Sequence, residues 1–179
     1  MDDLGFNVGS DNAWIGFKPS VGIWEASGEE VKFTHMLLDP SSLKTGWIQI
    51  QQGVGPDCHW DEAVGKVGNR PSEDHRRGFQ VMVYLKEGGW HQWQQNQVGV
   101  LQGFATVWAE IKAQMGSNED KVAVIKYNNF EINSKGKGTT RIPKLELVKW
   151  QDYPKDEESA SPPPPVKEST PAPSEDPLF

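Results

Sequence analysis

The chain has 179 residues, of which 36% are hydrophobic, and a formal net charge of −7; this length suffices for one domain with its own core. No apolar run approaches the ~18 residues of a membrane span, so no membrane protein is expected. The single cysteine, Cys58, excludes an internal disulfide, and the acidic N-terminus lacks the apolar stretch of a signal peptide. We therefore expect a cytoplasmic protein.

The charge and the composition both change near Trp150. Residues 1–150 carry 16 Lys and Arg against 18 Asp and Glu, whereas residues 151–179 carry 2 against 7 and hold eight of the 13 prolines. A segment with so few apolar residues cannot offset the entropy cost of folding. The sequence therefore predicts a domain at 1–150 and a disordered, Pro-rich acidic tail at 151–179. The nearly neutral domain can still present a basic groove if its charges separate by face.

The body is expected to consist mainly of strands separated by Gly, Pro and Ser turns. In chain order, strands are predicted at 14–17, 31–38, 45–51, 79–86, 121–128 and 140–150, with a long loop at 53–75. In the third of these, alternation places Ile48 and Ile50 on one face and Trp47 on the other.

One helix is predicted at 97–115, where apolar residues from Val100 to Met115 recur at helical spacing. Asn96 is the expected N-terminal cap, Gly116 ends the helix, and Trp108 on the apolar stripe is expected in the core. A single helix between the third and fourth core strands favours a mainly β fold: a five-stranded OB-fold-like barrel with extra N-terminal strands. An α+β sandwich would give the same order of elements.

Eight tryptophans are many for this length, and such rings need a core or a binding surface. A protein that binds single-stranded nucleic acid without sequence preference displays aromatic rings and cations together on a sheet. Trp47 and Tyr84 are the best candidates for base stacking, because each shares its predicted strand face with polar side chains. Further candidates lie in polar stretches: Trp60, Trp90 and Trp93. The alternative is that these rings cover the ends of a barrel or pack beneath the N-terminal extension.

Basic candidates for phosphate contact flank the predicted strands, and a Gly-rich turn at 134–138 can approach a nucleic-acid backbone closely. They are Arg76, Arg77, Lys86, Lys135, Lys137, Arg141 and Lys144. In an OB fold the turn would join strands 4 and 5, a common binding loop. Exposed turns are also often basic for solubility alone.

No enzyme, cofactor or metal is expected from the residue patterns. The segment 137–140 lacks the spacing of a phosphate-binding loop. Cys58 and His59, with Asp57 and Asp61 nearby, could contribute to a metal site. However, there is no second cysteine, and the other histidines are scattered along the chain.

Two segments resemble a known family. The tip Glu175-Asp176-Pro177-Leu178-Phe179 follows a Pro-rich acidic linker, and the basic turn at 135–138 runs into a Pro-containing strand that ends at Trp150. In both respects the chain resembles bacteriophage single-stranded DNA-binding proteins of the OB-fold type, whose tips resemble those of bacterial single-stranded DNA-binding proteins. The common bacterial tip places its aliphatic residue before the proline, whereas here the proline comes first.

The resemblance implies a protein that coats single-stranded DNA during phage replication, recombination or repair, in the host cytoplasm. It implies that Phe179 and Leu178 anchor the tip in a partner's apolar pocket and that Asp176 meets a basic rim. The acidic tail is also expected to occupy the protein's own groove until DNA displaces it. Two other classes stay open: a carbohydrate-binding β-domain, and a recruitment protein that only displays the tail. A homodimer is compatible with the sequence.

Overall fold

The computed structural model describes residues 13–51, 53–134 and 138–154. This part of the chain is mainly β, with nine strands, one α-helix and a short 3-10 turn, η1 (Met115–Ser117). In chain order the main elements are β1 (Ala13–Lys18), β2 (Ile23–Ala26), β3 (Glu29–Val31), β4 (His35–Gln49), β5 (Asp57–Trp60), β6 (Arg76–Leu85), β7 (Gly89–Gln95), α1 (Val98–Gln114), β8 (Lys121–Asn133) and β9 (Thr140–Asp152).

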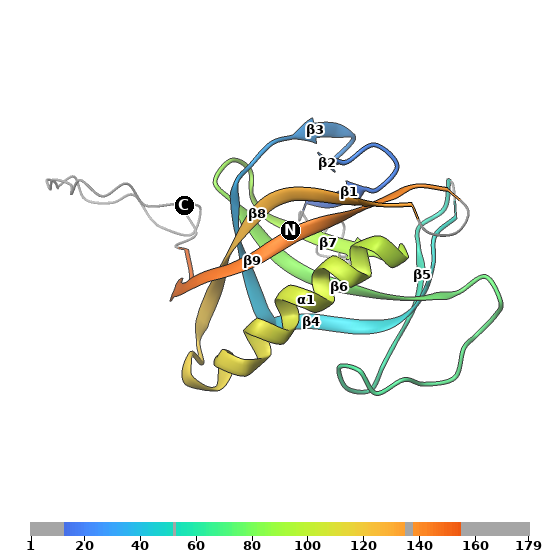
Figure 1. Cartoon of the computed structure of the whole chain (residues 1–179). Helices are drawn as coiled ribbons and strands as arrows, with labels where there is room; N and C mark the ends of the chain where they lie inside the picture. The colour runs from blue at the N-terminus through green and yellow to red at the C-terminus, as the bar shows by residue number, and fades with distance from the viewer. Residues whose placement is uncertain (1–12, 52, 135–137, 155–179) are drawn as a thin grey trace, which may run out of the picture.

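All nine strands belong to one curled sheet with the order β3-β2-β1-β7-β6-β4-β8-β9, and β5 pairs with β4 beside this path. Figure 1 shows the sheet curling into an open half-barrel with α1 lying across it. β1 runs parallel to β7, and the other pairings are antiparallel. Within the described residues no pairing joins β9 back to β1 or β7, so the sheet has two ends.

The long strand β4 belongs to both halves of the sheet. Its first half lies between β6 and β8, and its second half lies between β6 and β5. The register against β6 shifts between Asp39 and Lys44. Pro40 falls in this interval, where the missing backbone N–H costs no ladder hydrogen bond.

The core lies between the concave side of the sheet and α1. Phe104 of α1 stacks on Phe79 of β6 with ring centroids 4.2 Å apart, and it meets Trp93 of β7 edge-on at 5.6 Å. α1 also packs closely on β9, because a Cβ atom at Gly103 would collide with the carbonyl oxygen of Pro143. The glycine therefore allows the helix to approach the strand.

The mainly β fold with one helix is confirmed, but the strands predicted at 31–38 and 45–51 fall mostly within the single strand β4, and the sheet is an open half-barrel of nine strands. The helix begins at Val98 without a side-chain cap, and Asn96 instead donates a hydrogen bond to the carbonyl of Ile48 in β4. Ile48 is buried as expected, but Ile50 lies past the end of β4 and is 53% exposed. The prediction for Ile50 was wrong because the strand ends before it.

Two further differences concern the loop at 53–75, which contains β5, and the end of the domain. β9 continues to Asp152, beyond the predicted boundary at 150. The predicted tail from 155 to 179 lies outside the described residues, as does its tip. In the described part of the chain, no helix is long and apolar enough to cross a membrane.

Candidate nucleic-acid interface

The sheet has a second surface, on the side turned away from the core. Residues opposite one another in paired strands point to the same side, so the registers define this surface. We call it the outer face and define it by these paired residues of β1, β4, β6 and β7: Trp14, Leu37, Asp39, Lys44, Gln80, Met82, Tyr84, Trp90, Gln92 and Gln94. The same row continues through Gly46, Gly78 and the buried Ile48 to Arg76. Apart from the buried Leu37, the side chains that define the face are half-buried or exposed. The outer face is therefore available for contact with a ligand.

Aromatic rings lie at two places on the outer face. Tyr84 and Trp90 are opposite one another on β6 and β7, with ring centroids 5.4 Å apart and edge to face. They pack on a small apolar cluster that includes Leu37. Trp14 lies beside Gln92 at the β1–β7 pairing and is 45% exposed. Rings supported from below and open at the side can stack on bases.

Trp60 extends this aromatic surface at the edge formed by β5. It lies opposite Gly46 of β4, where a side chain larger than hydrogen would strike the Trp60 backbone and ring. The ammonium of Lys44 lies 5.8 Å from the centroid of the Trp60 ring. This cation–π contact places a positive charge beside an aromatic ring on the same face.

Amide and basic side chains complete the outer face. The Gln92 side chain donates a hydrogen bond of 3.0 Å to the Gln80 side chain across β6 and β7. Alternation along β6 puts Arg76 on the same side as Gln80, and Lys86 follows directly after the strand on that side. Both cations are exposed. The β6 row thus has a positive charge at each end.

The single carboxylate on the outer face as defined above, Asp39, is engaged locally. Its Oδ1 accepts hydrogen bonds from the backbone and hydroxyl of Ser41, at 3.0 and 2.7 Å, and from the hydroxyl of Tyr153, at 2.7 Å. Burial, followed by the bond to Asp39, raises the pKa of Tyr153. The Tyr153 ring lies 6.5 Å from Trp90. The chain therefore leaves its last strand against the outer face.

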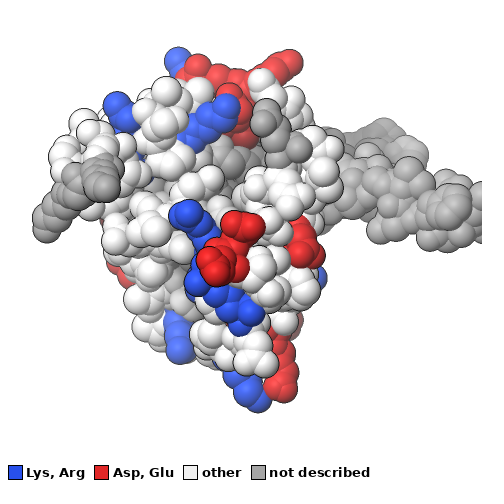
Figure 2. Space-filling view, turned by 90° about the vertical axis from the view of Figure 1, so that its right-hand side faces the viewer, with Lys and Arg blue, Asp and Glu red and all other residues white. Residues whose placement is uncertain are grey.

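The side of the molecule that carries β5 shows how the charges are distributed. In Figure 2 Lys and Arg lie next to Asp and Glu on a largely uncharged surface. No continuous basic patch covers the described residues in this view. This side of the molecule therefore presents no broad basic groove.

Trp47 lies on the opposite side of β4 from Lys44, where the loop at 61–75 covers it. Its indole N–H donates to the carbonyl of Gly68 at 2.9 Å. The guanidinium groups of Arg70 and Arg77 lie 5.5 and 5.2 Å from its ring centroid. The structure thus gives Trp47 a role in holding this loop, and its predicted contact with bases stays a prediction.

Arg77 serves the same loop. It donates two hydrogen bonds to Asp61, at 2.9 and 2.6 Å, and Thr45 donates a third at 2.6 Å. The Asp61 side chain is only 1% exposed. The hydrogen bonds from Arg77 are the main cause that lowers the pKa of Asp61. Arg77 is therefore paired internally, unlike its neighbour Arg76.

The other predicted residues fall in different places. The predicted stacking role of Trp93 is wrong, because its ring is fully buried and its indole N–H donates to the Gln95 side chain at 2.8 Å.

The remaining basic candidates lie elsewhere. Arg141 donates to the carbonyls of Pro19 and Ser20 in the β1–β2 turn, so its side chain links β9 to this turn. Lys144 is exposed on β9, which is not among the four strands that define the outer face. Lys135 and Lys137 lie outside the described residues, as do Glu175, Asp176, Pro177, Leu178 and Phe179.

Sequence reasoning missed Trp14 and Lys44. Trp14 and Gly16 alternate with the buried Ile15 and Phe17, and this alternation was the available signal. No sequence signal pointed to Lys44, because its partner Trp60 lies on β5, a short strand inside the loop that the sequence predicted.

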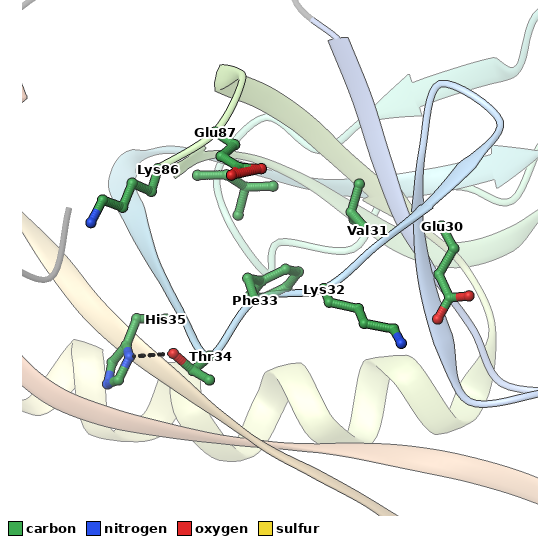
Figure 3. Close-up of a pocket in the computed structure, with 9 residues that line it drawn as sticks. Glu30, Val31, Lys32, Phe33, Thr34, His35, Lys86 and Glu87 are labelled. Carbon is green, nitrogen blue, oxygen red and sulfur yellow. Dashed lines mark hydrogen bonds between the residues drawn. The ribbon is translucent and has the colours of Figure 1, made fainter.

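A pocket of about 490 Å³ lies beside Lys86. Figure 3 shows that Lys86 and Glu87 come from the β6–β7 turn, whereas the remaining labelled residues run from β3 through the connecting segment to the start of β4. Thr34 and His35 hydrogen-bond at 3.0 Å. Burial, followed by the nearby Lys126 and Lys149, lowers the pKa of His35. The pocket mixes both signs of charge.

Comparisons of this chain with protein-family models, with curated proteins and with solved structures gave no match.

Proposed function

We propose that this chain binds single-stranded DNA without sequence preference, through the outer face, and protects it during replication, recombination or repair. One observation carries the proposal: Trp14, Tyr84, Trp90 and Trp60 share one sheet surface with amide side chains and with Lys44 and Arg76. The single carboxylate of the defined face, Asp39, is already hydrogen-bonded. No chemical step is part of this function.

The physical basis is stacking combined with charge neutralisation. Every base has a π-face, so a stacked ring contributes about 1–3 kcal/mol whatever the sequence. Lys44, Arg76 and Lys86 lie near the rings and can meet phosphates. Three such contacts predict that affinity falls roughly 20-fold for a fourfold rise in salt, from a slope of about −0.7 per phosphate for single strands.

The order of elements supports an OB-like interpretation of the fold. β4, β6 and β7 form a meander, α1 follows, and β8 and β9 complete the series, with β8 returning to pair with β4. In OB folds the meander strands and the loops after the first and fourth strands bind nucleic acid. The outer face lies on this meander, and the loop after β4 carries β5 with Trp60.

The tail is proposed to recruit partner proteins through residues 175–179. Tyr153 holds the last described segment against Trp90 and Asp39, so the acidic stretch after it starts at the edge of the proposed site. Removing residues 155–179 while keeping Tyr153 should raise DNA affinity, most clearly at low salt. Equal affinity of the shortened and full chains would refute competition by the tail.

The test is quenching of tryptophan fluorescence by oligo-dT at low and high salt. Trp14→Ala should weaken binding about 10-fold, in line with the loss of one stacked base. Lys44→Ala should reduce the magnitude of the salt slope by about 0.7. Lys112→Ala and Met115→Ala are the matched controls and should leave affinity unchanged, because Lys112 is exposed on α1 and Met115 is exposed on η1.

The outcomes separate the proposal from its rivals. If neither the full chain nor residues 1–154 binds oligo-dT at low salt, DNA binding is refuted. Binding of oligosaccharides that is indifferent to salt would instead support a carbohydrate-binding domain. A chain that binds neither and still captures a replication protein through its tip would be a recruitment protein.

A further inference from the structure

Three metal-binding side chains from two separate segments converge at the base of the loop at 57–75. Asp57 and His59 come from β5, and His75 comes immediately before β6. The Asp57 carboxylate Oδ2 lies 3.3 Å from Nε2 of His59 and 2.9 Å from Nε2 of His75. All three donor atoms lie within 4.8 Å of one another.

We propose that Asp57, His59 and His75 form a site for a divalent transition-metal ion, with Zn²⁺ as the best fit. Two imidazole nitrogens and one carboxylate oxygen are a donor set that zinc favours, with bonds of about 2.0–2.2 Å. A tetrahedral ion with such bonds separates its ligands by about 3.3–3.6 Å. Small rotations of exposed side chains bring the present distances into this range. The inference stands apart from the proposed DNA binding.

The strand geometry selects these ligands. Alternation along β5 sends Asp57 and His59 to one side and Cys58 to the other, where Cys58 lies opposite Ile48. The thiol is therefore not a ligand, although it is the residue that first suggests a metal in the sequence. Asp57 and His59 have side chains 55% and 51% exposed, which leaves a fourth position open to water.

His75 is fixed in the orientation that a ligand needs. Its side chain is buried, and its Nδ1 lies 2.8 Å from the hydroxyl of Ser72. Arg70 donates to the carbonyl of His75 at 2.9 Å. A hydrogen bond on one ring nitrogen sets which nitrogen faces the metal. Ser72 is thus a positioning residue, and Nε2 of His75 is directed at the other two donors.

A bound ion would tie β5 to the start of β6 and close the loop between them. The same loop already rests on β4 through Trp47 and Asp61. The ion would take the place of the hydrogen bonds between the two histidines and Asp57. Its two positive charges would exceed the single carboxylate charge, so the open position would accept water or an anion.

The experiment titrates Zn²⁺ alone into the full chain, free of any affinity tag and of chelator, by calorimetry. One ion should bind per chain. Loss of a residue that hydrogen-bonds a metal ligand typically weakens metal binding about 10–100-fold, and Ser72→Ala should fall within this range. Asp57→Asn and His59→Asn each remove a ligand and should weaken binding by more than this. His35→Asn, on β4, is the control and should bind zinc like the unaltered chain.

A second readout uses Co²⁺, whose visible absorption reports tetrahedral nitrogen and oxygen ligation. It should appear with the unaltered chain and disappear with Asp57→Asn. These substitutions are at exposed residues, and circular dichroism of each variant is the check that it is folded. Absence of binding, or binding that is unchanged in both Asp57→Asn and His59→Asn, would overturn the proposal.

Discussion

Asp61→Ala should destabilise the domain far more than the neighbouring substitution Glu62→Ala. Asp61 accepts three hydrogen bonds, two from Arg77 and one from Thr45, and its side chain is 1% exposed. Glu62 pairs with Lys66 at 2.8 Å, but both side chains are about two-thirds exposed. The two acids are adjacent in sequence, so they form a matched pair that differs in burial.

The size of the effect follows from these contacts. Hydrogen bonds to a charged group contribute about 1.5–3 kcal/mol each. Arg77 is 28% exposed, so it recovers part of its hydration when Asp61 is lost, and the expected decrease in unfolding free energy is about 3 kcal/mol. An exposed ion pair contributes about 0–1 kcal/mol, which sets the expectation for Glu62→Ala.

Urea denaturation monitored by tryptophan fluorescence gives the measurement. With a slope of about 1.5–2 kcal/mol per molar urea, Asp61→Ala should lower the midpoint by about 1.5–2 M, and Glu62→Ala by at most about 0.7 M. Equal shifts for the two variants, or a shift below about 0.3 M for Asp61→Ala, would refute the view that this carboxylate secures the loop.

Three further predictions concern the same architecture. The folded state lowers the pKa of Asp61. Its contribution to stability is therefore fully present above its unfolded pKa, near 4, and is lost as the pH falls through the lower folded value. Acid unfolding of Asp61→Asn should lack this pH-dependent loss of stability. Trp47→Phe should cost about 1 kcal/mol through the lost indole hydrogen bond while oligo-dT affinity stays within about twofold, and a 10-fold loss would instead show base stacking by Trp47. Gly103→Ala should lower stability by about 1–3 kcal/mol because its Cβ meets Pro143, whereas Gly116→Ala, which meets nothing within 4 Å, should be neutral by thermal unfolding.

Local patterns in the sequence carried much of the fold. Strict alternation from Phe79 to Leu85 predicted β6, and the apolar stripe from Val100 to Ile111 predicted α1 to within a residue at each end. Both patterns arise from contacts that every residue of the element shares. β5 was missed because its four residues pair at an edge and carry no apolar alternation. The pairing of β1 with β7 and the open ends of the sheet depend on contacts between distant segments.

The candidate site was less accessible from sequence. Tyr84 was predicted correctly to share a half-exposed strand face with Gln80 and Met82, since alternation fixes that arrangement. Trp93 shows the same polar neighbours in sequence, yet it is buried, because its strand is central and Phe104 and Phe79 enclose it. The approach of His75 to Asp57 depends on the path of a loop, which no local pattern encodes.

The shared strand β4 has a consequence for how the molecule opens. Leu37 and Leu38 hydrogen-bond within ladders to β6 and β8, and residues 46–48 lie between β6 and β5. Neither half of the sheet can separate from the other without breaking one of these ladders. Amide protons along β4 should therefore exchange with solvent only when the whole domain unfolds, as a single cooperative unit. A substitution that destabilises the outer face should then also destabilise the loop at 57–75, and the reverse should hold as well.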